Sequence, residues 1–284
     1  MNICFRVDAS YKIGTGHVMR CLTLAEELKK KGNNVVFVCR LHDGHLCKRI
    51  IQLGFEVLKL EKPKEYNEGR LYHSKWLGVS QLQDVKETKE LIITKNFSFD
   101  WIIVDHYAID EEWETEIRSL IPNIMIIDDL ADRKHDCDIL LDQNYYIEGP
   151  LRYKQLVPTN CQLLIGPKYA LLRNEFIKFH NLPIIFGQEW FNILVFYGGS
   201  DPTNETLKMI NVIKQLGISN LSAHIVVGPS NPNAKIIKEA CNDDRFIFHY
   251  NINYMAKLMY ETDIALCAGG STTWERYCVG LPGI

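Results

Sequence analysis

Residues 3–39 read ICFRVDASYKIGTGHVMRCLTLAEELKKKGNNVVFVC, and the order of patterns in this stretch indicates how the chain folds. An apolar run (3–7) precedes a loop with two glycines, an amphipathic segment (18–31) and a second apolar run (35–39). Short apolar runs are typical of buried strands, and apolar residues three or four positions apart are typical of a helix packed on one side. A strand, a helix and a strand in this order predict a βαβ unit with parallel strands.

The same alternation continues along the chain and predicts an α/β fold. Further strands are expected at 55–60, 101–104, 124–127 and 139–141, and helices at 45–53, 81–94 and 111–120. A second series is expected to hold strands at 193–197, 223–227, 246–249 and 264–267, and helices at 206–216 and 254–260. Because the stretch 179–187, with its proline and aromatic residues, separates the two series, we expect two Rossmann-like domains, 1–180 and 190–284, that face each other across a ligand-binding cleft.

The length, charge and cysteine usage bound the function. A chain of 284 residues suffices for two domains of ordinary size. Its 32 basic and 35 acidic residues leave a formal charge of -3, so no long-range field attracts nucleic acid or anionic lipid. The start lacks a signal-peptide pattern, no run of 18 apolar residues occurs, and the nine cysteines include no Cys-x-x-Cys pair. We expect a cytoplasmic protein with buried thiols and no metal, membrane or nucleic-acid partner; its oligomeric state is left open.

The last residues, GLPGI (280–284), stand where the alternation predicts another strand. The sequence ends within this expected strand. We therefore expect the second domain to be incomplete in this chain.

The loop IGTGHVMR (13–20) is the sharpest local feature. Gly14 and Gly16 allow close backbone approach and leave the first helical N–H groups free for an anion or a sugar oxygen. The three-glycine dinucleotide pattern fails, because Met19 occupies the third position, and the basic loop of a Walker motif is missing as well. We take Gly14, Thr15 and Gly16 as substrate-binding candidates.

His17 falls in the first turn of the predicted helix. The positive partial charge of a helix N-terminus disfavours imidazolium, and neutral imidazole can accept a proton from water. A capping or packing histidine is the alternative, but the place between a glycine turn and the expected cleft favours a general base. We expect the other histidines at the surface or in packing, with His106 undecided.

Polar residues follow several expected strands of the first domain. Ligands of open α/β sheets bind at the carboxyl edge, where such residues gather. Strand ends are often polar simply because they meet water, so one such residue alone predicts little. The prediction rests on finding polar residues after several strands of the same sheet. The residues are Asp8, Asp105-His106-Tyr107, Asp128-Asp129 and Asp142-Gln143-Asn144.

Two further glycine turns join strands to helices in the second half. In GGSDP (198–202), Asp201 is expected to be the N-cap and the proline after it the first helical residue. In GGSTTWE (269–275), backbone N–H groups and hydroxyls could hold a diphosphate, and Glu275 could accept hydrogen bonds from both hydroxyls of a ribose. A capping box formed by Thr272 and Glu275 is the alternative that needs no ligand.

The polar segment 61–80 is long for a connection inside a compact domain. Such lengths are typical of lids and binding loops. Gln81, Asp84 and Thr88 follow it on one helical face, for which a solvated surface is the usual explanation.

Several of these motifs together resemble one known family. They are RVDAS (6–10), GTGHVMRCLTLA (14–25), WLGVSQ (76–81), VDHY (104–107), IDD (127–129) and YALLR (169–173). In this order, through nearly the whole chain, they resemble the PseG family, the UDP-2,4-diacetamido-2,4,6-trideoxy-β-L-altropyranose hydrolases of pseudaminic acid biosynthesis. The turns at Gly198 and Gly269 resemble those of the wider GT-B superfamily, which includes the MurG-type glycosyltransferases and binds UDP mainly in its C-terminal domain.

The resemblance implies a UDP-amino-sugar hydrolase that uses neither cofactor nor metal. UDP would lie on the turn 269–275, and His17 would activate a water for attack at the anomeric carbon with inversion. Helix N–H groups would take the charge of the departing diphosphate. Asp8 is expected to orient His17 or the sugar. The expected substrate-binding residues are Gly14, Thr15, Gly16, Arg20, Asp105, Tyr107, Asn144, Gly198, Gly199, Ser200, Gly269, Gly270, Ser271, Thr272 and Glu275.

Two other functions stay open. A MurG-like glycosyltransferase would use the same fold and nucleotide, with a sugar or lipid acceptor in place of water; the first domain has no apolar and basic run that would favour membrane docking. A non-catalytic UDP-sugar-binding protein would need no base at His17.

Overall fold

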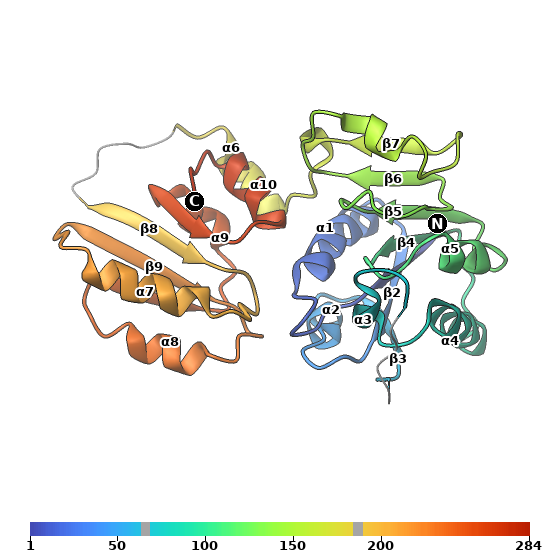
Figure 1. Cartoon of the computed structure of the whole chain (residues 1–284), viewed down its shortest axis with the longest axis horizontal. Helices are drawn as coiled ribbons and strands as arrows, with labels where there is room; N and C mark the ends of the chain where they lie inside the picture. Colours follow the sequence, from blue (N-terminus) through green and yellow to red (C-terminus); the bar gives the residue numbers. More distant parts are fainter. Residues whose placement is uncertain (64–68, 184–189) are drawn as a thin grey trace. The chain divides into compact units, whose positions relative to one another are not determined.

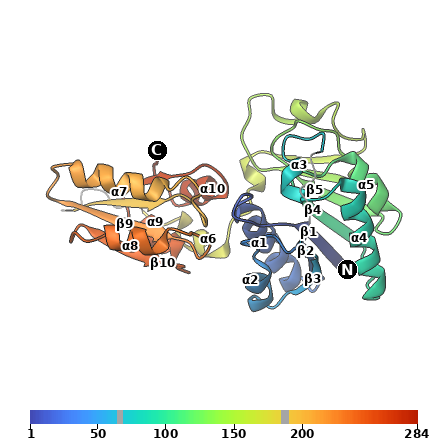
Figure 2. The ribbon, with the colours of Figure 1, turned by 60° about the horizontal axis from the view of Figure 1, so that its bottom comes forward.

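A computed structural model of the chain describes two compact units, which are drawn in Figures 1 and 2. The described residues are 1–63, 69–183 and 190–284. The first unit comprises Met1–Ile13 and His17–Leu171, and the second comprises Leu172–Ile284 together with Gly14–Gly16. Each unit is an α/β domain with its own parallel sheet.

The first unit is built on a parallel sheet of seven strands in the order β3-β2-β1-β4-β5-β6-β7 (Figure 1). The strands are β1 (Asn2–Val7), β2 (Asn34–Arg40), β3 (Glu56–Leu60), β4 (Trp101–Asp105), β5 (Asn123–Ile127), β6 (Ile139–Asp142) and β7 (Gln162–Ile165). The sequence predicts the first six from their runs of branched and aromatic residues, which are buried on both faces except in the edge strand β3, where Glu56 and Lys59 are exposed. It misses β7, which has only four residues, none of them fully buried.

Helices cover both faces of this sheet, as Figure 2 shows. They are α1 (Gly16–Lys30), α2 (Cys47–Gln52), α3 (Ser74–Leu77), α4 (Gln81–Thr94) and α5 (Glu111–Arg118), with short 3-10 turns η1 (Gly149–Tyr153) and η2 (Pro167–Tyr169). On the α1 and α2 face, Val18 packs with Phe5 of β1. On the α4 and α5 face, Trp113 packs with Ile102 of β4. Two apolar cores therefore hold the sheet between them.

The strand order creates a switch point between β1 and β4. From β1 the chain proceeds outward to β2 and β3, and it then returns to β4 on the other side of β1. In the parallel register Val7 lies beside Asp105, so both strands end at the same level. Ligands of open α/β sheets bind in the crevice outside the carboxyl ends of strands at such a point.

The second unit has a parallel sheet of four strands in the order β10-β9-β8-β11. The strands are β8 (Phe191–Phe196), β9 (Leu221–Val227), β10 (Phe246–Tyr250) and β11 (Ile264–Cys267). The helices are α6 (Asn174–His180), α7 (Glu205–Gln215), α8 (Ala234–Ala240), α9 (Met255–Tyr260) and α10 (Ser271–Cys278). Gly283 forms a parallel bridge with Ala265 of β11, at the place where the sequence predicts a further strand.

The second unit begins earlier than the expected boundary at residue 180. Phe176 of α6 is fully buried in one core with Leu194 and Val226, so α6 belongs to the second unit. The sequence does not reveal this, because one short amphipathic helix carries no mark of the sheet against which it packs. Of the expected linker 179–187, residues 184–187 lie outside the described part of the chain.

A network of buried charges links β1, β2 and α4 in the first unit. The Arg6 guanidinium pairs with Asp8 at 2.7 Å and with Asp84 at 2.8 Å, and Arg40 pairs with Asp84 at 2.7 Å. The Trp113 indole N–H donates to Asp84 at 3.0 Å. Burial would raise the pKa of Asp84, but the charges of Arg6 and Arg40 hold the pKa below its ordinary value.

The prediction that this polar face of α4 is solvated is therefore wrong for two of its three residues. Asp84 and Thr88 are both fully buried. Helical periodicity alone cannot distinguish a polar stripe that faces water from one that faces buried arginines.

Replacement of Asp84 by alanine should destabilise the protein by about 3–5 kcal/mol, because it leaves two buried guanidinium groups without their shared carboxylate. Urea unfolding measures this free energy. The matched control is Glu90→Ala on the same helix, at an exposed pair with Lys86 4.0 Å apart, where a change within about 0.5 kcal/mol is expected. Equal stabilities of the two variants would contradict the role given to Asp84.

Candidate active site

His17 and Asp105 meet at the switch point of the first sheet. His17 lies in the first turn of α1, and Asp105 is the last residue of β4. The Nδ1 atom of His17 is 2.5 Å from Oδ1 of Asp105. One helical turn later, Arg20 donates from Nε to Oδ2 at 2.6 Å and from Nη2 to Oδ1 at 2.7 Å. Both oxygens of the fully buried Asp105 are thus held.

The charge of Asp105 fixes the tautomer of His17. Burial would raise the pKa of Asp105, but the charges of Arg20 and His17 and their hydrogen bonds hold the pKa far below its ordinary value. An ionised carboxylate only accepts hydrogen bonds, so Nδ1 of His17 carries the hydrogen of this contact. In the neutral ring Nε2 is then the acceptor, which is the arrangement of a general base oriented by a carboxylate.

Arg20 extends the network to a second carboxylate. Its Nη1 donates to Oδ2 of Asp129 at 3.0 Å, the Tyr107 hydroxyl donates to the other oxygen, and the Asn144 amide donates to Oδ2 at 3.3 Å. The contact of Arg20, Asp105, Tyr107 and Asn144 with substrate stays a prediction; in the structure these polar groups are joined by hydrogen bonds to the carboxylates of Asp105 and Asp129. The reason is that strand ends bring many polar groups into a buried place, where each needs a partner. They form the frame of His17.

Aromatic rings surround His17. The Tyr107 ring is 4.5 Å away and nearly perpendicular, and the Trp76 ring is 6.1 Å away. Trp76 lies nearly parallel to Tyr107 at 5.7 Å, and His73 is 4.5 Å from Trp76. Of the segment 61–80, residues 64–68 lie outside the described part, but Trp76 packs near the His17 ring and His73 packs against Trp76. A role of this segment as a lid or binding loop stays a prediction.

Of the two roles expected for Asp8, the structure gives the orientation of His17 to Asp105 instead, whereas orientation of the sugar stays a prediction. Asp8 contacts the Arg6 guanidinium, the Arg40 backbone N–H at 2.7 Å and the imidazoles of His106 and His42, whose Nε2 atoms are 3.3 Å and 3.6 Å away. Asp8 is 1% exposed. The carboxylate that orients His17 is that of Asp105. The Asp8 carboxylate instead links β1 to β2 through its hydrogen bonds with Arg6 and Arg40.

The undecided His106 belongs to the buried frame. Its Nδ1 accepts from the backbone N–H of Ala108 at 3.1 Å, so the hydrogen of the neutral ring resides on Nε2, facing Asp8. Burial lowers the pKa of His106 and outweighs the opposing effect of Asp8. His106 therefore serves the frame as a neutral ring.

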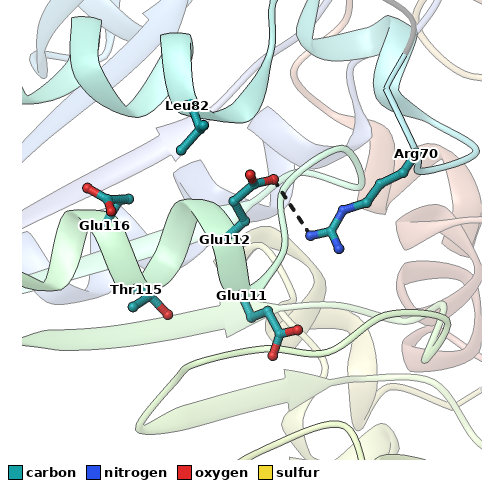
Figure 3. A pocket seen from close by; sticks show the side chains of 6 residues that line it. All are labelled: Arg70, Leu82, Glu111, Glu112, Thr115 and Glu116. Carbon is teal, nitrogen blue, oxygen red and sulfur yellow. Dashed lines mark ion pairs between the residues drawn. The ribbon is translucent and has the colours of Figure 1, made fainter.

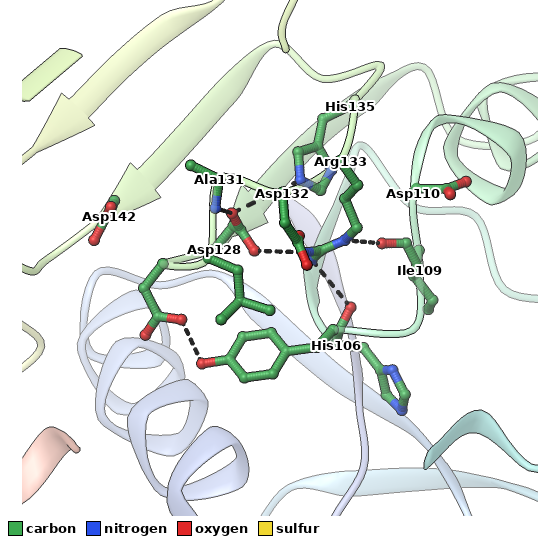
Figure 4. Close-up of polar contacts among 12 residues, drawn as sticks. His106, Ile109, Asp110, Asp128, Ala131, Asp132, Arg133, His135 and Asp142 are labelled. Atoms are coloured by element: carbon green, nitrogen blue, oxygen red, sulfur yellow. Dashed lines mark hydrogen bonds and ion pairs between the residues drawn. The ribbon is translucent and has the colours of Figure 1, made fainter. Parts of the chain in front are cut away.

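Arg133 joins the loops that carry Tyr107 and Asp129 (Figure 4). Its Nη1 pairs with Asp128 at 2.8 Å, and its Nε donates to the carbonyl of Ile109 at 2.7 Å. Burial and these partners leave Arg133 only 5% exposed. The cross-link keeps the residues after β4 and β5 in a fixed arrangement beside His17. The sequence did not single out Arg133, because nothing near it marks a buried arginine.

The glycines before His17 leave space at the start of α1. Gly14 has a φ of +81°, which favours glycine, and Gly16 is the first helical residue. A Cβ atom at either glycine would meet no atom within 4 Å. Thr15 between them is half-buried. This open geometry suits the expected substrate contacts, which stay a prediction.

The turn 198–202 of the second unit caps α7 differently from the expectation. Asp201 accepts from the backbone N–H groups of Glu205 at 2.8 Å and Thr206 at 3.0 Å. Helix α7 begins at Glu205, with Asn204 in the N-cap position, so neither Asp201 nor Pro202 has the place that the sequence predicts. The Asp201 carboxylate nevertheless satisfies the first helical N–H groups, from further back in the chain.

The backbone of Gly199 also explains why residue 228, which the sequence pattern does not mark, is a glycine. A Cβ atom on Gly228, just after β9, would lie 2.5 Å from the carbonyl oxygen of Gly199. The two backbones approach so closely that only glycine fits at 228. Gly198, with a φ of +83°, makes the turn itself, and Ser200 is buried beneath it.

The turn 269–275 leaves its glycines exposed. Gly270, with a φ of +128°, is the N-cap of α10 and has no side-chain cap, so the alternative capping box is not formed. Gly269 and Gly270 are exposed, whereas Ser271 and Thr272 are half-buried. The carboxylate of Glu275, which is 8% exposed, points to a different partner, the guanidinium of Arg173.

A separate cavity of about 690 Å³ lies between α4 and α5 (Figure 3). Its lining residues are Arg70, Leu82, Glu111, Glu112, Thr115 and Glu116. Three carboxylates against one guanidinium disfavour a diphosphate there.

Among the described residues, no three side chains of His, Cys, Asp or Glu are grouped to hold a metal ion. In the same part of the chain, every helix is too short or too polar to cross a membrane.

Comparison with solved structures identifies the class of fold. The chain superposes on MurG of Acinetobacter baumannii with a TM-score of 0.57 at 13% identity, covering 99% of this chain and 77% of that one. The rhamnosyltransferase SpnG gives a TM-score of 0.62 at 13% identity, covering 100% and 80%. The likeness to these two structures confirms the predicted α/β fold of the GT-B class.

Two curated proteins match nearly the whole chain. The UDP-2,4-diacetamido-2,4,6-trideoxy-β-L-altropyranose hydrolase of Campylobacter jejuni is 29% identical over 281 residues, which are 97% of this chain and 87% of that protein. The uncharacterized protein MJ1062 of Methanocaldococcus jannaschii is 28% identical over 291 residues. The chain spans about half (54%) of MJ1062's length.

SpsG of Bacillus subtilis, a spore coat polysaccharide biosynthesis protein, is 22% identical over 286 residues, which are 99% of this chain and 76% of that protein. No family model matches the chain.

The tautomers of two histidines offer a test of the site without substrate. His17 should carry its hydrogen on Nδ1 because Asp105 accepts it, and His106 should carry it on Nε2 because Ala108 donates to Nδ1. Two-dimensional NMR of ¹⁵N-labelled histidine distinguishes the tautomers near pH 8. In Asp105→Asn the new amide can donate to Nδ1, so only the His17 signals should change to the other tautomer. An unchanged tautomer in that variant would contradict the assigned contact.

Acid should destabilise the first unit through Asp105. Since its folded pKa is depressed, its ionisation contributes stability above the unfolded value of about 4, and this stability is lost as the pH falls below it. Urea unfolding between pH 6 and pH 3 should show a steeper loss of stability in the wild type than in Asp105→Asn. Identical pH slopes would mean that the Asp105 carboxylate gains nothing from its partners.

Proposed function

We propose that this chain is a hydrolase that cleaves UDP-2,4-diacetamido-2,4,6-trideoxy-β-L-altropyranose, or a closely related UDP-amino sugar, to the free sugar and UDP. The single observation that carries the proposal is the His17–Asp105 pair, 2.5 Å apart at the switch point of the sheet. Water attacks the anomeric carbon in one displacement, with inversion. The product serves pseudaminic acid or a related surface glycan, made in the cytoplasm.

His17 is the proposed general base. As the water oxygen bonds to the anomeric carbon and the bond to the UDP oxygen breaks, Nε2 of His17 takes the proton. Asp105 accepts the hydrogen on Nδ1 and stabilises the imidazolium that forms, without itself becoming protonated. Arg20 holds the Asp105 carboxylate in the plane that this contact requires. General base catalysis of this kind contributes about 10²–10⁴ to the rate.

The second unit is the proposed UDP-binding domain, and the first carries the base and the sugar site. The exposed turn at Gly269 and Gly270 offers backbone N–H groups at the start of α10, where a diphosphate is favoured. Glu275 is the proposed ribose acceptor. Because UDP is a stable anion when it leaves, the reaction needs little help from a general acid, and N–H groups stabilise the developing charge. We propose no metal or cofactor.

The relatives support this choice of substrate class. The C. jejuni protein is named for this hydrolysis, and SpsG is named for polysaccharide biosynthesis. The alternative is a glycosyltransferase, because MurG and SpnG share the fold. The His17–Asp105 pair also fits that function, since the His17 base can activate a sugar hydroxyl as well as water. Turnover without an acceptor separates the two reactions.

Activity assays on a panel of UDP-amino sugars test the proposal. Wild type should release UDP and free sugar without any acceptor and in the presence of EDTA. His17→Ala should lower kcat by about 10²–10⁴, whereas the control His45→Ala, at an exposed histidine of the same unit, should retain wild-type rates. Asp105→Asn should also lower kcat, because it removes the carboxylate that stabilises the imidazolium.

Two outcomes would contradict the proposal. Undiminished hydrolysis by His17→Ala would remove this residue from the mechanism. Binding of the UDP-sugars without any turnover until an acceptor is added would favour the glycosyltransferase.

A further inference from the structure

Two cysteines face each other at the amino ends of β6 and β7. Cys137 lies two residues before β6, and Cys161 lies directly before β7. The two strands pair in parallel, with Ile139 beside Gln162, and they lie side by side in Figure 1. The two cysteines are 24 residues apart in the chain, and their Sγ atoms are 3.6 Å apart. The pair therefore lies at the edge of the first sheet that is opposite to the candidate active site.

The geometry of this pair suits a disulfide. Neighbouring strands lie about 4.8 Å apart, within the range of Cα separations of about 4.4–6.8 Å that a disulfide spans. The sulfurs of a disulfide are about 2.0 Å apart, so rotation of the two side chains has to bring them about 1.5 Å closer. The bond can therefore form with the strands in their present register.

The two thiols differ in their access to solvent. Cys137 is 2% exposed, whereas Cys161 is half-buried. Burial disfavours a thiolate, so the more exposed Cys161 loses its proton first, and the Cys137 thiol then donates its hydrogen to the sulfur of Cys161. A reagent in solution reaches the Cys161 sulfur, and Cys137 waits beside it.

The surroundings support this division of roles. The hydrogen bond from Cys137 and the charge of His135 lower the pKa of Cys161, against the effects of burial and of Asp138. The hydrogen bond to Cys161 and burial raise the pKa of Cys137. Burial would lower the pKa of His135, but the charge of Glu114, whose Oε1 is 2.8 Å from Nδ1, raises it. Because the thiolate is the nucleophilic form of cysteine, Cys161 is the attacking residue.

We infer that Cys137 and Cys161 form a redox site, at which a hydroperoxide closes a reversible disulfide that fastens the edge strand β7 to β6. The Cys161 thiolate attacks one peroxide oxygen, the O–O bond breaks, and the other oxygen leaves with a proton as an alcohol, or as water from hydrogen peroxide. The Cys137 sulfur then attacks the sulfenic acid (S–OH) on Cys161. The S–S bond forms, the S–O bond breaks, and the hydroxyl leaves as water with the Cys137 proton. The two sulfurs together lose the two electrons that the peroxide gains.

A dithiol reverses this step by thiol–disulfide exchange and is itself oxidised to a disulfide. Such reversibility is typical of redox-sensing disulfides in a reducing compartment. The inference goes beyond the proposed hydrolysis, because neither cysteine takes part in it.

Strand β7 is the element that the disulfide would hold. It is an edge strand of four residues, none of them fully buried. The backbone N–H groups of Gln162 and Gly166 donate to the carbonyls of Asp138 and Asp142, both at 2.8 Å. Elements with few buried contacts open locally more readily than the core of a sheet. A bond at the beginning of β7 closes the segment 138–160 and restricts this opening.

Two other sets of cysteines provide comparisons within the same chain. Cys39 and Cys47 are also joined by a hydrogen bond, but they are 3% and 2% exposed, so neither is accessible to a reagent. Cys241 of the second unit is half-buried like Cys161, but burial raises its pKa to about 11. Exposure without a lowered pKa makes Cys241 the matched control.

The chemical test treats the reduced full chain with hydrogen peroxide, alkylates the remaining thiols under denaturing conditions and maps the products by mass spectrometry. Wild type should form the Cys137–Cys161 disulfide, and dithiothreitol should reverse it. In Cys137→Ser, Cys161 should stop at the sulfenic acid, which dimedone captures. In Cys161→Ser, Cys137 should stay reduced, whereas the control Cys241→Ser should form the disulfide at the wild-type rate. Cys161 should react at least about 10-fold faster than Cys241.

Hydrogen exchange followed by NMR tests the effect on β7. In oxidised wild type the amide hydrogens of Gln162 and Gly166 should exchange at least about 10-fold more slowly than in the reduced protein, because the bond restricts the opening of β7. The control is the amide of Phe191 in β8 of the second unit, which donates to the carbonyl of Asn220 at 2.8 Å and should exchange equally in both states.

Three outcomes would overturn the inference. Wild type in which Cys161 is oxidised while Cys137 stays reduced would show that the pair does not close. Peroxide reacting with Cys241 as fast as with Cys161 would mean that the pair has no special reactivity. Equal exchange of the β7 amides in both states would show that the bond does not fasten the strand. Neither measurement uses a nucleotide or a sugar, so these results do not depend on the proposed function.

Discussion

The site of the first unit depends on one buried carboxylate. Asp105 ends β4 beside β1, and both of its oxygens accept from His17 and Arg20. A charge this deeply buried is tolerated only because a guanidinium compensates it, and the same compensation keeps it ionised. The ionised form in turn determines which nitrogen of His17 is left to accept a proton. The strand register and the first turn of α1 thus bring His17 and Asp105 together, and this one contact determines the tautomer of the imidazole ring.

The fold supplies the rigidity that this contact needs. On the far side of β1, Arg6 and Arg40 share Asp84, which joins two strands to α4. Near the site, Arg133 joins the loops after β4 and β5. Each cross-link carries a desolvation cost and returns little net stability compared with an apolar core. Their value lies in fixing the directions of side chains at the carboxyl edge, so that His17 meets Asp105 in one arrangement.

The sequence predicts the strands of the first sheet well where buried runs are long, and it fails where local pattern lacks information. β7 is too short, and α6 shows no preference for either unit. The choice of carboxylate failed for a different reason. Asp8 and Asp105 both directly follow predicted strands, and only the rotation of α1 over the sheet decides which one reaches His17. Asp84 was assigned to the surface, because a polar helical stripe looks the same whether it faces water or buried arginines.

The most direct test of the account follows oxygen from solvent during hydrolysis of the UDP-sugar in H₂¹⁸O. Attack by a water that His17 activates places the label on the anomeric carbon of the released sugar, and early NMR spectra should show the inverted anomer. Label on the UDP phosphate, with none on the sugar, would mean that water attacks phosphorus. That result would contradict the central claim that the His17–Asp105 pair delivers water to carbon.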